Sequence, residues 1–313
     1  MSNLLRYPVR TAVCICALLL GRTAYAQALT VLYPDLGNPY RAVFNEIIQG
    51  IEEQSKARAR SIPLAANADT VELRNTLKSG KVVIALGRQG LKAATTLDPS
   101  LGVVVGGVAG ISATAQDGER LSGISLTPDP ALLFAMLKSL MPGVRRVIVI
   151  YNPQTNEALI RLAKEAARGV GLELAAIEAS DLASAARAYE AQFAAADSRR
   201  DAIWLPQDPV TAEETTILPL VLKESWTHSL AVFSSSILHV KQGVLFGLYP
   251  NNVQLGRDLA SLAQAMQNGE TLRRGLVPLR AVRTAINSRT ASHLGVNFAP
   301  GQQRSFDAVF PEP

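Results

Sequence analysis

Polar side chains that could hold a small molecule follow a short apolar run near the middle of this sequence. Asn152, Gln154, Thr155 and Asn156 come directly after "RRVIVIY", whose β-branched residues are typical of a buried strand. In an open α/β sheet the loop at the carboxyl end of a strand faces the ligand crevice. The amide and hydroxyl groups of this turn are therefore candidates for hydrogen bonds with a small polar ligand.

Four further turns carry groups of the same kind. The candidates are Asn38 and Tyr40 in "DLGNPYRAVF", Arg88 and Gln89 in "GRQG", Gln207 and Asp208 in "WLPQDPV", and Ser234 and Ser235 in "FSSSI". Each has a purely structural alternative, because Asn38 and Asp208 suit helix N-caps, Tyr40 could merely pack, and Arg88 could be solvated in a tight turn. The sequence leaves both roles open for each residue.

The chemistry of these groups suggests how a solute would be held. Arg88, at the start of a predicted helix, would receive a carboxylate, and Asp208 would accept from an amine. We expect the turn at 152–156 to oppose the turns at 38–40 and 88–89 across a crevice, with 207–208 and 234–235 completing the clamp. A solute between two walls must replace its bonds to water from both sides, so several groups have to converge on it.

Catalytic and metal-binding patterns are missing from the sequence. The chain has three histidines, His228, His239 and His293, and no two are spaced as zinc ligands on one helix face. "SGISL" lacks the order of a serine nucleophile turn. Polar groups after several strands without a proton-transfer constellation favour binding over turnover, so we expect no enzyme activity, no cofactor and no metal site.

The first residues have the pattern of an export signal. Arg6 and Arg10 precede the apolar "AVCICALLLG", and "TAYAQ" places Ala24 and Ala26 where a signal peptidase reads small residues. We therefore expect a signal peptide over residues 1–26, cleaved after Ala26, and a periplasmic product. The apolar run is short of the roughly 20 residues of a membrane span.

Composition narrows the class further once this leader is removed. Its three arginines take the formal charge from +5 to +2 (5 minus 3), which gives no electrostatic reason to expect a nucleic acid partner. The remaining 287 residues (313 minus 26) suit two lobes, and we expect a monomer. Hydrophobic residues make up 48% of the chain but aromatic ones only 5%, which suits cores of Ala, Leu and Val between helices and sheets.

Short apolar runs alternate with longer segments of helical spacing along nearly the whole chain. Predicted strands are 29–34, 81–86, 102–107, 145–151, 172–178, 201–206, 230–235 and 243–248. Predicted helices are 40–57, 69–79, 88–96, 128–141, 155–169, 181–196, 210–227 and 252–268. Such alternation predicts an α/β fold with parallel sheets flanked by helices.

Two breaks divide this alternation between two lobes. One is the proline-rich "LTPDP", and the other precedes the last long helix, after "GVLFGLYPNN". We expect an N-terminal lobe of 27–125 with 238–275, and a C-terminal lobe of 126–237 with 276–313. A chain that leaves a lobe, returns and leaves again supplies several crossing segments, which form a hinge.

Several blocks of the sequence resemble a known family. "RRVIVIYNPQTNEALIRLAKEAARGVGLEL", the stretch around "WLPQDPV", "GVLFGLYPNNVQLGRDLASLAQAMQNGE" and "INSRTASHLGVNF" are similar to the substrate-binding proteins of ABC importers with the type I periplasmic-binding-protein fold. The resemblance covers about residues 120–297 and is to the branch that includes binders of tryptophan and other aromatic amino acids. The family shows "PTDNT" where this chain has "PQDPV".

The resemblance implies two Rossmann-like lobes joined by a three-strand hinge. It implies a small solute, an amino acid or similar, as ligand and an ABC permease in the inner membrane as partner. A second hypothesis is an extracytoplasmic sensing module that reports a bound ligand to a membrane receptor or kinase. Nothing in the sequence separates the two roles.

Overall fold

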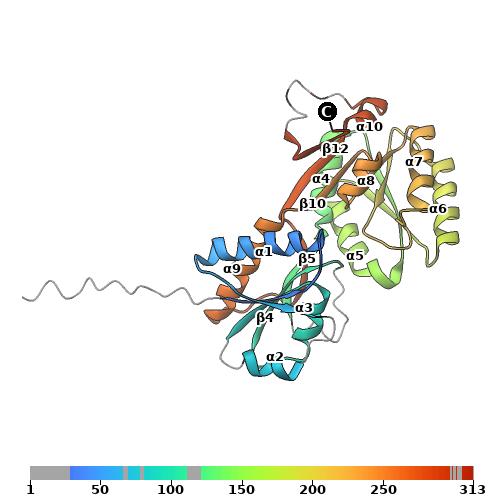
Figure 1. Cartoon of the computed structure of the whole chain (residues 1–313). Helices are drawn as coiled ribbons and strands as arrows, with labels where there is room; N and C mark the ends of the chain where they lie inside the picture. The colour runs from blue at the N-terminus through green and yellow to red at the C-terminus, as the bar shows by residue number, and fades with distance from the viewer. Residues whose placement is uncertain are drawn as a thin grey trace, which may run out of the picture.

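The computed structural model describes residues 29–65, 70–77, 81–110, 121–296, 298, 301 and 305–312. The signal peptide predicted over 1–26 lies outside the described residues. Within them, no helix is long and apolar enough to cross a membrane. The described chain forms two sheets, each flanked by helices, and Figure 1 shows them as two lobes.

The first lobe is built on a six-stranded parallel sheet. In spatial order its strands are β2 (Arg60–Leu64), β1 (Thr30–Pro34), β3 (Val82–Leu86), β4 (Gly102–Val108), β5 (Ser122–Pro128) and β11 (Gly275–Leu279). Helices α1 (Tyr40–Ser55) and α9 (Asn252–Gln267) pack on one face, and α2 (Thr70–Leu77) and α3 (Gly87–Ala94) on the other. Both faces are covered, which explains why β3 is apolar at every position.

Helices α1 and α9 lie side by side although some 200 residues separate them in the sequence (Figure 1). Their approach depends on Gly50 and Gly256. A Cβ at Gly50 would overlap the carbonyl oxygen of Val253, and one at Gly256 would overlap that of Ile47. The two glycines therefore let α9, which comes late in the chain, dock closely on the first lobe.

The second lobe contains a seven-stranded sheet. Its order is β13 (Ala308–Phe310), β12 (Val282–Asn287), β10 (Phe246–Pro250), β9 (Ala231–Ser234), β8 (Asp201–Leu205), β6 (Arg146–Tyr151) and β7 (Glu173–Glu178). The pairs are parallel except β10 with β12.

Helices cover both faces of this second sheet. Helices α4 (Pro130–Leu140), α5 (Pro153–Gly169) and α10 (Ser288–His293) share one core with it, and α6 (Leu182–Ala195) and α7 (Ile217–His228) share another. The side chains of β6 alternate between the two cores, with Val147 and Val149 in the first and Ile148 and Ile150 in the second. The short helix α8 (Ile237–Gln242) packs with β12 and β13.

Within the described residues the chain passes between the sheets three times: after β5, after β10 and after β11. These segments are tied to one another. The N–H of Asp129 donates to the carbonyl of Leu279 (2.9 Å), and the N–H of Asn251 donates to that of Ala281 (2.9 Å). Arg280 also forms an ion pair with Asp129. The predicted two-lobe α/β fold with three crossing segments is therefore confirmed.

The crossings fall later in the chain than the predicted lobe boundaries. Residues 238–250, predicted for the first lobe, contain α8 and β10, and β10 pairs with β9 and β12 of the second sheet. Residues 276–279, predicted for the second lobe, lie in β11, which pairs with β5 of the first. The break "LTPDP" likewise belongs to β5 up to Pro128. The proline- and glycine-containing breaks in the sequence indicate where turns lie. Which sheet each strand joins is decided by strand pairing, which those breaks do not encode.

All eight predicted strands exist, and five more were not predicted. These are β2, β5, β11, β12 and β13. β2 lies at a sheet edge, is exposed at Arg60, Ser61 and Pro63, and so lacks the apolar run of the central strands. The helix predicted over 210–227 is α7, which begins only at Ile217.

Candidate functional site

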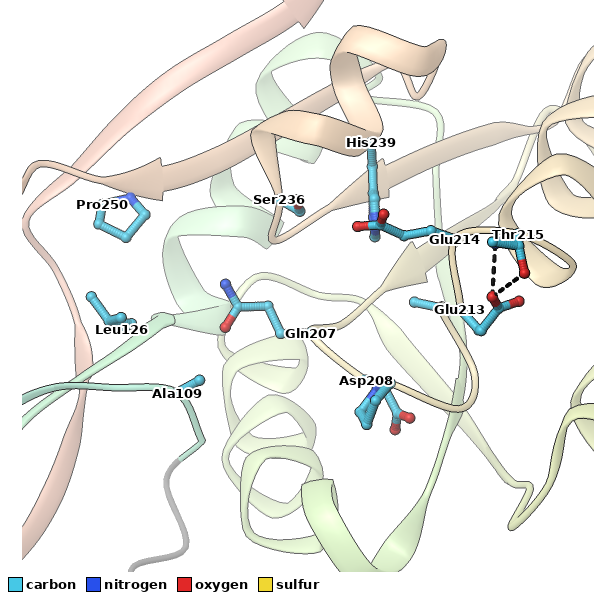
Figure 2. A pocket seen from close by; sticks show the side chains of 12 residues that line it. Ala109, Leu126, Gln207, Asp208, Glu213, Glu214, Thr215, Ser236, His239 and Pro250 are labelled. Atoms are coloured by element: carbon cyan, nitrogen blue, oxygen red, sulfur yellow. Dashed lines mark hydrogen bonds between the residues drawn. The ribbon is translucent and has the colours of Figure 1, made fainter. Parts of the chain in front are cut away.

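A cavity of about 670 Å³ lies where the two lobes meet. Figure 2 shows the side chains that line it: Ala109, Leu126, Gln207, Asp208, Pro209, Ala212, Glu213, Glu214, Thr215, Ser236, His239 and Pro250. Ala109 and Leu126 belong to the first lobe, Pro250 ends β10 at a crossing, and the others belong to the second lobe. The cavity therefore has a wall on each lobe and a crossing segment beside it.

The first-lobe wall is apolar. Ala109 directly follows β4, and Leu126 lies in β5. The N–H of Gly110 donates to Oγ1 of the buried Thr127 at 3.0 Å, which fastens the end of β4 to β5. Gly110 has φ +87°, a conformation that favours glycine at this turn.

The second-lobe wall is organised around Asp208, a buried carboxylate whose two oxygens accept four hydrogen bonds. Oδ1 accepts from the N–H groups of Val210 (2.9 Å) and Thr211 (3.0 Å). Oδ2 accepts from the N–H of Asn152 (2.8 Å) and from Nδ2 of Asn156 (2.9 Å). We call this set of five residues the Asp208 network. It joins the turn after β8 to the turn after β6.

The Asp208 network corrects the helix-cap role offered for Asp208 and gives Asn152 a capping role that was not predicted. Asp208 caps a tight turn rather than the start of a helix, because α7 begins nine residues later. Asn152 is the N-cap of α5, where its Oδ1 accepts from the N–H of Gln154 at 3.0 Å. Both oxygens of Asp208 are engaged with the protein, so an amine would have to displace existing bonds to reach it.

Glu213 holds the loop between this turn and α7. Its carboxylate accepts from the N–H groups of Thr215 (2.8 Å) and Thr216 (2.7 Å) and from the hydroxyl of Thr215. These hydrogen bonds, led by that of the Thr215 hydroxyl, lower the pKa of Glu213 to about 2. Glu213 thus holds the turn that leads into α7, and the dashed lines of Figure 2 show its bonds to Thr215.

Four polar side-chain groups of the second-lobe wall remain without a partner among the described residues. They are Oε1 of Gln207, Nε2 of His239, the hydroxyl of Ser236 and the carboxylate of Glu214. Burial lowers the pKa of His239, although the charge of Glu214 acts in the opposite direction. The imidazole is therefore held toward its neutral form.

The residues predicted at the ends of β6 and β9 do not line the cavity. Asn156 is buried in the Asp208 network, whereas Gln154 and Thr155 are exposed at the start of α5. Ser234 and Ser235 are buried: the hydroxyl of Ser234 lies 2.8 Å from Nδ1 of His239, and that of Ser235 accepts from Nε1 of Trp204 at 3.2 Å. Of the twelve predicted residues, Gln207 and Asp208 line the cavity.

The four predicted residues of the first lobe lie outside the cavity lining. Asn38 is exposed and is not the N-cap of α1, because Pro39 holds that position and makes no side-chain cap bond. Tyr40 is 64% exposed. Arg88 is exposed and Gln89 partly buried at the start of α3, which begins at Gly87 as the "GRQG" turn predicted. A contact of these residues with a solute stays a prediction.

Sequence reasoning missed the residues that follow Asp208 and His239 itself. Helical spacing extended the predicted helix over 210–227, which concealed that 210–216 form an irregular segment along the cavity. One signal was available: Thr216 stands directly before the apolar "ILPLVL", and a threonine in that place is typical of a helix start. His239 lies only five residues after its partner Ser234, but no sequence pattern links a serine at the end of a strand to a histidine in the helix that follows.

Two lobes of mostly parallel sheets, three crossings and a cavity at the lobe boundary define a protein of the type I periplasmic-binding-protein fold. The sequence profile described as "ABC transporter substrate binding protein" matches residues 68–300. The chain belongs to this family.

Solved structures with the same fold are distant in sequence. The ligand-free, open structure of CD0873, a substrate binding protein with adhesive properties from Clostridium difficile, is 16% identical with a TM-score of 0.65. An ABC domain from Streptococcus pneumonia, in complex with L-Trp, is 15% identical with a TM-score of 0.57. A conserved domain protein from Vibrio cholerae is 17% identical with a TM-score of 0.55. Each similarity covers 90% of this chain and 99% of the other.

No curated protein sequence matches this chain. The solved structures show the fold of this chain.

Proposed function

We propose that this protein captures a small solute between its two lobes in the periplasm and delivers it to an ABC permease. The observation that carries the proposal is the cavity of about 670 Å³ with walls from both lobes. Its volume falls within the range of about 300–1,000 Å³ that is usual for small-molecule sites.

The hinge supports a closing motion. The crossing segments are bonded to one another through Asp129, Leu279, Asn251 and Ala281, while each lobe has separate hydrophobic cores. Rotation about these segments would bring the wall of Ala109 and Leu126 over the second-lobe wall and remove a solute from water. A permease would then recognise the closed form, because closure changes the surface that both lobes present.

The family supports binding without turnover, as does the capping role of the two best-bonded carboxylates at the cavity, Asp208 and Glu213. An amino acid or a similar small polar compound is the first class to test, since one structural neighbour was solved with L-Trp. The alternative, a sensing module that reports to a membrane receptor, would use the same closure.

The experiment starts with protein exported to the periplasm and purified without denaturation. Native mass spectrometry should find a co-purified solute of fixed mass, and small-angle scattering should show a more compact particle when the purified solute is added back. Recovery of the solute chemically unchanged after long incubation supports a binder, and conversion of it would contradict this role.

Transport and sensing are separated in cells. Deletion of the gene should abolish uptake of the labelled solute if the protein serves an importer. Unchanged uptake together with a lost transcriptional response to the solute would favour the sensing role.

A further inference from the structure

The unengaged polar groups of the cavity are all able to accept hydrogen bonds. They belong to four residues of the second lobe: Gln207 after β8, Glu214 before α7, Ser236 before α8 and His239 in α8. The hydroxyl of Ser236 can also donate, whereas the carbonyl of Gln207 and the carboxylate of Glu214 only accept. Among the twelve described lining residues, none is Lys or Arg. The site therefore offers acceptors and negative charge, and these lining residues provide no cation for an anionic group.

Gln207 presents its carbonyl oxygen because its amide nitrogen is already used. Nε2 donates to the backbone carbonyl of Ser235 at 3.1 Å, and a carbonyl can only accept, so the orientation of the amide is fixed. Oε1 is buried and has no partner. Figure 2 shows this amide in the middle of the site, between Leu126, Pro250 and Ser236. A buried acceptor without a donor destabilises the empty site, and a donor on the solute would satisfy it.

His239 is 5% exposed and is fixed from behind. Its Nδ1 lies 2.8 Å from the hydroxyl of Ser234, and that hydroxyl lies 3.2 Å from the carbonyl of Leu205 and accepts from the N–H of Ser236. When the hydroxyl donates to Leu205, Nδ1 carries the imidazole proton and Nε2 is left as an acceptor. Nε2 has no partner in the described part of the chain, and the ring lines the cavity.

Glu214 adds a full negative charge beside these acceptors. Its carboxylate makes no hydrogen bond or ion pair with the described residues, unlike that of its neighbour Glu213. In Figure 2 it lies next to the imidazole of His239, and its charge is close enough to act on the pKa of that ring. An exposed, unpaired carboxylate on a cavity wall is free to bind a cation.

Five of the described lining residues are apolar. Ala109, Leu126, Pro209, Ala212 and Pro250 lie around these acceptors, and Ala109 and Leu126 come from the opposite lobe. A solute that fills the cavity must therefore bury a nonpolar body against both lobes while its polar end faces the second lobe alone.

We propose that the solute is an organic ammonium ion, an amine with an apolar body and no carboxylate, whose N–H groups bind Glu214, Gln207 and His239. An α-amino acid would bring a carboxylate next to Glu214, where like charges repel. This inference rests on the proposed function and specifies the class of solute.

Matched compounds separate the contribution of each charge. Calorimetry at pH 7.5 compares tryptamine and phenethylamine with tryptophan and phenylalanine, and with indole-3-propionate and 3-phenylpropionate. We expect each amine to bind at least tenfold more tightly than its amino acid, with no measurable binding of the carboxylates. An amino acid that binds as tightly as its amine would overturn the inference while leaving a solute-binding protein.

Two variants locate the interaction. Glu214→Gln should weaken amine binding at least tenfold without changing the melting temperature of the unliganded protein, because the side chain makes no contact that holds the fold. Glu165→Gln removes an exposed carboxylate of α5 and serves as the matched control, with unchanged affinity. Amine affinity that stays within threefold in Glu214→Gln would overturn the inference.

A panel in which no amine binds would also overturn it. Native mass spectrometry of the freshly purified protein then decides the proposed function separately: a co-purified solute of another class sustains that function, and no solute in either experiment contradicts both.

Discussion

The two walls of the cavity are built differently. The second-lobe wall is fixed by the Asp208 network, which ties the turns after β6 and β8 together through four hydrogen bonds. The first-lobe wall consists of Ala109 and Leu126, while Tyr40 and Arg88 of that lobe point into solvent at the ends of helices.

This difference indicates how the work of binding is divided. Hydrogen bonds depend on direction and distance, so the wall that makes them must be in place before the solute arrives. Apolar burial does not depend on direction. The first-lobe wall can therefore rotate onto the solute and still stabilise the complex by burying nonpolar surface. We therefore expect the second lobe to set specificity and the first lobe to add affinity on closure.

The largest effect is expected from Asp208→Ala. The change leaves three backbone N–H groups and the amide of Asn156 without their acceptor, at least two of them buried. We expect a loss of about 3–5 kcal/mol in the free energy of unfolding, measured by urea denaturation, because a buried donor left unsatisfied costs about 1–3 kcal/mol. Asp35→Ala, which removes an exposed ion pair with Arg41, is the control and should cost under about 1 kcal/mol. Equal effects would mean that the network does not stabilise the second-lobe wall.

Gly256→Ala tests what holds the first lobe together. Its Cβ would overlap backbone atoms of Ile47 and Gly50, so α1 and α9 must separate. The expected cost is about 1–3 kcal/mol by the same measurement. Gly169→Ala is a suitable control, because nothing lies within 4 Å of the added atom. A neutral Gly256→Ala would show that the α1–α9 contact tolerates an added methyl group and that the glycines are not required.

Asp201→Asn examines the second lobe away from the cavity. Asp201 begins β8 and accepts from Nε of Arg146 (3.0 Å), from Nη2 of Arg146 and from the N–H of Asp197 (2.9 Å). Burial would raise the pKa of Asp201, but the hydrogen bonds and charge of Arg146 outweigh it and hold the pKa below its usual value. We expect Asp201→Asn to cost about 1–2 kcal/mol at pH 7 with solute affinity unchanged.

The sign of its pH dependence follows from the lowered pKa. The stability that Asp201 contributes is present above its unfolded pKa of about 3.9 and is lost as pH falls through the lower folded pKa. The gap between the parent protein and Asp201→Asn should therefore narrow as pH is lowered from 6 toward 3, as urea denaturation at each pH will measure. If the difference in unfolding free energy between the two proteins stayed constant with pH, the ion pair of Asp201 with Arg146 would not be its source.

The smallest effect is expected from Arg88→Ala. Arg88 is exposed and makes no hydrogen bond or ion pair with the described residues. Its removal should change the free energy of unfolding by less than about 0.5 kcal/mol and the affinity for an amine by less than about threefold. A tenfold loss of affinity for the amine, measured by calorimetry, would show that Arg88 contacts the solute. The first-lobe wall would then also contribute a polar contact.

The regular part of the fold could be read from the sequence with good accuracy. Apolar runs such as "KVVIAL" and "RRVIVIY" became β3 and β6, because a strand buried on both faces must be apolar throughout. Two of the strands that were missed, β2 and β12, have mixed burial, and β5 was missed although it is buried at nearly every position. Their pairing depends on partners distant in the sequence, which no local pattern encodes.

The sequence determined the class of the protein and the turns from which its site is built. It placed Asn152, Asn156, Gln207 and Asp208 after strands of one sheet, because the side-chain types and the strand endings are local properties. The tertiary structure decided which groups are free. Both oxygens of Asp208 are occupied by hydrogen bonds within the Asp208 network. The carboxylate of Glu214 and Nε2 of His239 have no partner among the described residues and can bind a solute. The reason is physical: a polar group is available only if no neighbour satisfies it, and those neighbours are brought together by folding alone.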